Sequence, residues 1–124
     1  MRISNVGDVS HAVEEQRGTA SARVRQLLHA LRPSQPECAS LFGSWARGEA
    51  DALSDLDVVL IKRTTQPFFE RLREARRLVP AALGGVDLLV YTPEEFAAMR
   101  RAGNAFAEMI VEEGCLLYGR HAAR

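Results

Sequence analysis

Two short groups of residues near the middle of the chain have the types and spacing needed to bind phosphate and a metal ion. Gly43 and Ser44 come first, and Asp55 and Asp57 follow after ten intervening residues. A Gly-Ser turn that leads into a helix presents unpaired amides at the positive end of the helix dipole, where they can cradle phosphate. Residues two apart in a strand point to one face, so the aspartates should project together, about 7 Å apart at their backbones. Such a pair suits Mg²⁺ shared with a nucleoside triphosphate.

The segments around these groups strengthen this interpretation. A short apolar run precedes Gly43, and Asp57 leads directly into Val-Val-Leu-Ile, which reads as a strand buried on both faces. Acidic residues are depleted in strands and costly at the end of a buried one. Two of them on one face therefore need a cation or a basic partner, and the alternative is a pair that caps a turn.

The order Gly-Ser-Trp-Ala-Arg-Gly-Glu-Ala, then Ser-Asp-Leu-Asp and a strand, resembles the nucleotidyltransferase superfamily of the DNA polymerase beta type. The ten-residue spacing and the length are similar to the minimal nucleotidyltransferases, which include antitoxins to HEPN-domain ribonuclease toxins. The resemblance runs from about residue 37 to 119, and only the block 43–57 is highly specific. It implies an α/β (α+β) fold with a small mixed sheet and helices packed on one side.

The resemblance also implies roles for individual residues. Asp87, which the family pattern would make the third carboxylate on a neighbouring strand, could by itself equally be a turn residue after Gly-Gly-Val. With Asp55 and Asp57 it would form the catalytic, metal-binding set for two Mg²⁺ ions and ATP as substrate. One ion would lower the pKa of an acceptor hydroxyl, and the other would neutralise the triphosphate as pyrophosphate leaves.

The Gly-Ser turn and the residues after it have competing interpretations. Gly43 would let the backbone approach phosphate closely, and Ser44 would bind it through hydroxyl and amide, or else cap an ordinary turn. Arg47 either touches the β or γ phosphate, or it faces solvent or pairs with a residue on its own helix. Trp45 either shields the nucleotide, contacts a partner, or packs partly into the surface.

Length, charge and cysteine content limit the classes of protein to which this chain can belong. The 124 residues are expected to form one domain, with an N-terminal helical segment at about 10–32 and a catalytic core at about 37–119. Sixteen basic residues balance sixteen acidic ones, so the net charge gives no reason to expect binding to nucleic acid or to a membrane. Cys38 and Cys115 are expected to pack in the core, which fits a reducing cytoplasm. No membrane span or secretion signal is recognised.

The apolar spacing predicts the elements that position the candidate site. Helices are expected up to Pro33, over 44–50, from Pro67 along an apolar stripe to Leu83, and after a Thr92 capping box, with a break at Gly103. Strands are expected at 38–42, 56–62 and 86–91. The arginines between residues 71 and 77 are expected to form a solvated face.

The resemblance implies a Mg²⁺-dependent nucleotidyl transfer, and we expect transfer of AMP from ATP to a hydroxyl of a partner protein. By the same resemblance this partner would be a HEPN-type toxin, so that the chain would act as an antitoxin. The protein acceptor is inferred from size, because a minimal domain lacks the extra domain that holds small-molecule or nucleic-acid acceptors. Two alternatives remain. The chain is a non-catalytic module that neutralises its partner by complex formation, or it modifies an aminoglycoside-like small molecule, for which a dimer would build the acceptor pocket.

Overall fold

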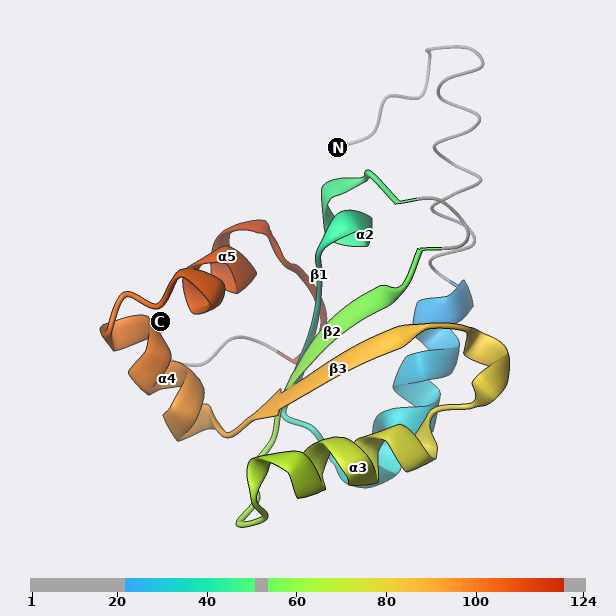
Figure 1. Ribbon diagram of the computed structural model, residues 1–124, viewed down its shortest axis with the longest axis horizontal. Helices are drawn as coiled ribbons and strands as arrows, with labels where there is room; N and C mark the ends of the chain where they lie inside the picture. The colour runs from blue at the N-terminus through green and yellow to red at the C-terminus, as the bar shows by residue number, and fades with distance from the viewer. Residues whose placement is uncertain (1–21, 51–53, 120–124) are drawn as a thin grey trace.

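One mixed sheet organises the computed structural model, which describes residues 22–50 and 54–119. The strand order is β3-β2-β1-β4 (Figure 1). The strands are β1 (Cys38–Phe42), β2 (Leu56–Ile61), β3 (Val86–Tyr91) and β4 (Cys115–Gly119). The helices are residues 22–31, α2 (Ser44–Arg47), α3 (Phe68–Leu78), α4 (Pro93–Arg101) and α5 (Ala105–Glu113), with 3₁₀ turns η1 (Arg32–Ser34) and η2 (Ala81–Leu83).

Helices cover both faces of this sheet. Val58 belongs to a core cluster that includes residues of the helix 22–31 and α3. Its neighbour Val59 faces the opposite way, into a second cluster with α4 and α5. Figure 1 shows α4 and α5 on one side of the strands and α3 on the other. The α/β fold with a small mixed sheet is therefore confirmed, whereas the expectation of helices on one side is wrong, because apolar side chains on both faces of β2 require cover.

Strand direction brings distant segments to one end of the sheet. β1 pairs antiparallel with both β2 and β4, and β2 pairs parallel with β3. The end of β1 therefore lies beside the beginning of β2, and the beginning of β3 lies on the other side of β2 at the same end of the sheet. The predicted phosphate turn and the predicted carboxylates belong to these three strand ends.

Local signals set most of the helix boundaries. Thr92 Oγ1 accepts a hydrogen bond from the Glu95 amide at 3.1 Å, and the Glu95 carboxylate accepts one from the Thr92 amide at 2.9 Å, which confirms the capping box. The break at Gly103 is also confirmed, because α4 ends at Arg101 and Asn104 caps α5.

The predicted continuation of one helix to Leu83 is wrong. α3 ends at Leu78, because Pro80 cannot donate the amide hydrogen that a further turn requires. Leu83 is nevertheless buried, and it reaches the core from η2. The N-terminal segment is helical over 22–31 within the described residues, and the predicted part before residue 22 lies outside them.

The two cysteines have different environments. Cys38 is buried in β1, as expected, and burial raises the pKa of its thiol. Cys115 is exposed, so the core prediction is wrong for this residue, because it lies on β4 at the edge of the sheet. Both thiols are free. Among the described residues, no helix has the length and apolar character needed to cross a lipid bilayer.

Arg71 departs from the solvated face that the arginine run predicts. Its guanidinium is buried and binds the Gln66 carbonyl at 2.8 Å and the Val90 carbonyl at 3.2 Å. It also forms a two-pronged ion pair with Glu95, at 2.7 and 3.0 Å. The hydrogen bonds from Arg71 hold the pKa of Glu95 below its ordinary value. Arg71 therefore joins α3 to β3 and α4, while the remaining arginines of the run are exposed.

Candidate active site

The pairing of β2 with β3 places two of the predicted carboxylates side by side. Asp57 and Asp87 are direct partners in the parallel register. Neighbouring strands lie about 4.8 Å apart, so both side chains project from the same face at adjacent positions. Asp55 lies two residues before Asp57 in the chain, just ahead of β2. The structure thus places Asp57 and Asp87 side by side, with Asp55 two residues before Asp57.

Close backbone approaches by two glycines accommodate these carboxylates. Gly43 has a positive φ of 75°, and a Cβ atom built on it would collide with the Asp57 carboxylate. A Cβ on Gly85 would likewise collide with the Asp55 carboxylate. Residues other than glycine would therefore displace a carboxylate at either point. The Gly43 turn therefore lies directly against the Asp57 carboxylate.

Burial and the neighbouring acidic groups raise the pKa of Asp57. Burial is the main cause that raises its pKa, and the hydrogen bond and charge of Asp87 raise it further. The charge of Asp55 acts in the same direction, whereas Arg47 opposes it. Like charges this close favour a bound proton or a bound cation.

The donor set fits a hard divalent cation. Carboxylate oxygens are the ligands that Mg²⁺ prefers, usually one or two from the protein together with substrate phosphates. Within residues 22–50 and 54–119, no group of three or more His, Cys, Asp or Glu side chains is already arranged around one metal position. Asp57 and Asp87 instead share a hydrogen bond. The arrangement is therefore an acidic pair with Asp55 beside it.

The residues of the Gly-Ser turn occupy α2 and its ends. Ser44 is the first residue of α2, and the Arg47 amide closes the turn on the Gly43 carbonyl at 3.1 Å. The first amides of a helix have no acceptor within it, so those of this turn are available to an anion. The Arg47 side chain pairs with Glu49 at 2.9 Å and is 44% exposed, which matches the solvent-facing interpretation.

Trp45 follows the packing interpretation. Its indole Nε1 donates to the Ser54 carbonyl at 3.1 Å, and its ring packs against the core on the side of the helix 22–31. It therefore joins α2 to the segment that leads into Asp55.

A pocket of about 300 Å³ opens beside β3 next to the acidic residues. Asp55 and Asp87 line one part of it, and Arg76 with the η2 segment lines another. Sequence reasoning missed Arg76, because its position in an arginine-rich helix gives no signal that separates it from solvated neighbours. It also missed Arg23, whose side chain contacts the loops that lead to Asp55 and Asp87.

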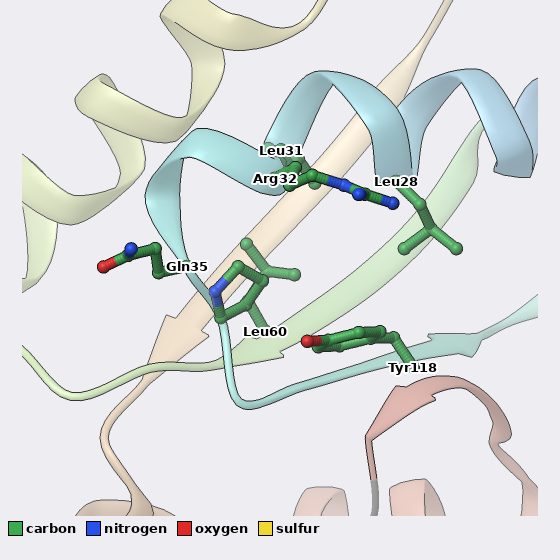
Figure 2. Close-up of a pocket in the computed structure, with 7 residues that line it drawn as sticks. Leu28, Leu31, Arg32, Gln35, Leu60 and Tyr118 are labelled. Carbon is green, nitrogen blue, oxygen red and sulfur yellow. The ribbon is translucent and has the colours of Figure 1, made fainter.

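A larger pocket of about 470 Å³ lies at the other end of the sheet (Figure 2). Its apolar lining comes from Leu28, Leu31, Leu60 and Tyr118. Because β2 begins at Leu56, beside the acidic residues, and ends at Ile61, Leu60 is remote from the acidic residues. This pocket holds no carboxylate and no candidate residue of the site.

Comparisons with known proteins identify solved structures with a similar fold. One chain of a toxin–antitoxin complex with AMP-PNP is 25% identical with a TM-score of 0.57, covering 78% of this chain and 73% of that chain. A candidate nucleotidyltransferase from Sulfolobus solfataricus (20% identity, TM-score 0.52, covering 91% and 88%) and the toxin–antitoxin MntA-HepT (22%, 0.52, 81% and 73%) share the fold. No curated protein matches. Residues 24–117 match the family model of the nucleotidyltransferase domain, and the chain therefore belongs to this family of nucleotidyltransferases.

Proposed function

We propose that this nucleotidyltransferase uses Mg²⁺ and ATP to transfer AMP to a hydroxyl of a partner protein, a HEPN-type toxin, and thereby acts as an antitoxin. The observation that carries the proposal is the register of β2 and β3, which sets Asp57 against Asp87 beside the Gly43 turn. Support for the nucleotide and the partner comes from the similar chain of a toxin–antitoxin complex with AMP-PNP. We place this chemistry in a single cytoplasmic domain, to which the free thiols of the described residues are suited.

Each group in the site has a role in this proposal. Asp55, Asp57 and Asp87 would hold two Mg²⁺ ions, and the first amides of α2, with the Ser44 hydroxyl, would bind the phosphates. Bound Mg²⁺ supplies charge screening for the triphosphate and a lower pKa for the acceptor hydroxyl. Arg47 reaches a phosphate only when it leaves Glu49, its partner at 2.9 Å.

The sheet order supports separate positions for the two substrates. The Gly43 turn lies at the β1 side of Asp57, and the pocket lined by Asp87 lies at the β3 side. ATP therefore enters over α2, and the acceptor hydroxyl enters from β3. Its oxygen attacks the α-phosphorus, the bond to pyrophosphate breaks, and the hydroxyl proton passes to Asp87 or to water.

The direct test measures the mass of the partner after incubation with nucleotide. The protein is incubated with the product of the adjacent gene, MgCl₂ and each of the four nucleoside triphosphates in turn, and intact masses are recorded. We expect one or more AMP units on the partner with ATP alone, and none after chelation of Mg²⁺. Neutralisation of the partner without added mass would contradict the transferase proposal and favour a module that acts by complex formation.

Replacing Gly43 by alanine should impair transfer far more than it impairs folding. The new Cβ would collide with the Asp57 carboxylate and displace it, and a displacement of about 1 Å in such a site can cost about 10²-fold in rate. Transfer rates and thermal unfolding should be measured together.

Gly48→Ala is the matched control for this variant. Gly48 also has a positive φ, of 77°, but a Cβ there meets nothing within 4 Å. Gly48→Ala should lose about 1 kcal/mol of stability, because Gly48 has a left-handed helical backbone with ψ 20°. Gly43→Ala should lose about 1 to 3 kcal/mol, because its ψ of -151° lies in a region that only glycine adopts readily, and it alone should lose activity. Equal rates in the two variants would contradict a role for the close approach of Gly43 to Asp57.

A further inference from the structure

One arginine of the helix 22–31 binds three backbone carbonyls in two segments around the acidic residues. Arg23 Nη1 donates to the Ser54 carbonyl at 3.0 Å, and Nη2 donates to the Gly85 carbonyl at 3.2 Å. Its Nε donates to the Leu83 carbonyl at 3.2 Å. A guanidinium can span several acceptors in this way, because its donors form a rigid planar fork.

Two of these carbonyls lie in the segments that carry the proposed metal ligands. Ser54 directly precedes Asp55, and Gly85 lies two residues before Asp87. The Gly85 carbonyl also accepts the Leu56 amide at 3.0 Å, at the point where β2 and β3 begin to pair. Arg23 therefore joins the start of β2 to the start of β3 from outside the sheet.

Arg23 is also connected to α2, through the Ser54 carbonyl and the Trp45 ring. The Ser54 carbonyl accepts a second hydrogen bond, from Trp45 Nε1 at 3.1 Å. The Arg23 guanidinium carbon lies 5.8 Å from the centre of the Trp45 ring, within the range of a cation–π interaction. The phosphate turn, the start of β2 and the start of β3 thus share one guanidinium.

The helix that carries Arg23 is anchored independently of the acidic residues. Leu27 and Leu31, one and two turns further along, are fully buried in the core. Arg23 directly precedes residues 24–117, which match the family model, so the family match does not include it.

We propose that Arg23 is a positioning residue for the active site, holding the starts of β2 and β3 so that Asp55 and Asp87 converge beside Asp57. This inference rests on the proposed function in that these carboxylates bind Mg²⁺. Arg23 itself touches neither substrate. Residues that orient metal ligands typically change metal affinity or activity by about 10- to 100-fold when they are lost.

The test compares Arg23→Met and Arg23→Lys with the wild type. Arg25→Met is the matched control, because Arg25 is exposed on the same helix. Amide hydrogen exchange without nucleotide or metal reports whether Arg23 holds the starts of β2 and β3 together. The Mg²⁺ dependence of AMP transfer reports whether this contact positions the carboxylates. Lysine keeps the charge but lacks the fork, so Arg23→Lys separates charge from bridging.

We expect faster exchange of the Leu56 amide in both Arg23 variants, with no change at the Lys62 amide, which bonds to Tyr91 at 2.9 Å at the other end of the same strand pair. The Mg²⁺ concentration for half-maximal transfer should rise about tenfold. Arg25→Met should match the wild type in both measurements.

Two results would overturn the inference. Unchanged exchange at Leu56 would show that Arg23 does not hold the strand ends, and equal acceleration at Leu56 and Lys62 would indicate a general loss of stability. Absence of transfer by the wild type would overturn the proposed function, while the exchange comparison would still decide whether Arg23 orders the two strand ends.

Discussion

Replacing Asp57 by asparagine is expected to reduce AMP transfer by about 10³-fold while the protein stays folded. Asparagine has nearly the same shape but cannot supply a negatively charged oxygen, so binding of Mg²⁺ beside Asp87 should weaken strongly. A loss of about 4 kcal/mol in transition-state stabilisation corresponds to this rate change. Transfer is measured by intact mass of the partner, and Mg²⁺-dependent binding of ATP is measured by calorimetry.

Folding should not suffer from this substitution. The pKa of Asp57 is raised mainly by burial and next by Asp87, which means that its charged form is unfavourable in the folded chain without a cation. A neutral amide relieves this repulsion, and the free energy of unfolding should stay within about 1 kcal/mol of the wild type.

Glu94→Gln is the matched control for the loss of one negative charge. Glu94 lies on α4 after the far end of β3, and its side chain is 72% exposed. This control should retain full activity. An Asp57→Asn protein that still adds AMP to its partner at the wild-type rate would contradict the proposed role of the acidic residues. If it neutralises its partner fully without adding AMP, neutralisation works by complex formation.

Replacing Arg71 by methionine should produce the largest loss of stability. Methionine retains much of the apolar stem but removes donors to the Gln66 carbonyl, the Val90 carbonyl and the Glu95 carboxylate. The two carbonyls and the carboxylate would then be left without their buried donor. We expect the free energy of unfolding to fall by about 2 to 3 kcal/mol. This loss is smaller than the full cost of breaking a buried ion pair, because the Glu95 side chain is 43% exposed and water screens its charge.

Arg73→Met provides the comparison, since it lies on the same helix and pairs with Glu70 at 2.7 Å while 59% exposed. Such an exposed pair contributes about 0.5 kcal/mol. Denaturant unfolding measures the loss in free energy of unfolding for Arg71→Met and for Arg73→Met. Similar losses in the two would contradict the assigned difference between the buried and the exposed pair.

The Arg71 contribution should also depend on pH. Arg71 holds the pKa of Glu95 below its ordinary value, so this carboxylate binds fewer protons in the folded chain than in the unfolded chain. The associated stability is complete above the ordinary glutamate pKa and is lost as the pH falls through the lowered value. The difference between wild type and Arg71→Met should therefore shrink on acidification.

Elements with a strong local signal could be predicted from the chain alone. The capping box at Thr92 depends on residues three apart, and the break at Gly103 depends on one residue and its neighbours. The 43–57 block likewise carries its turn, spacing and strand within fifteen residues. The end of α3 was missed although its cause is local, because the apolar stripe continues past Pro80 and masks the proline.

The sequence by itself determined the chemistry that this protein can carry: a Gly-Ser turn, an Asp-x-Asp pair at the start of a buried strand, and the family that this order resembles. Only the tertiary structure decided which distant residues meet there. The β2–β3 register, and no local pattern, sets Asp87 against Asp57, and helix packing brings Arg23 to the backbone of both strands. The physical reason is that strand register and helix packing arise from contacts between segments far apart in the chain, whereas spacing in a sequence reports only local preference.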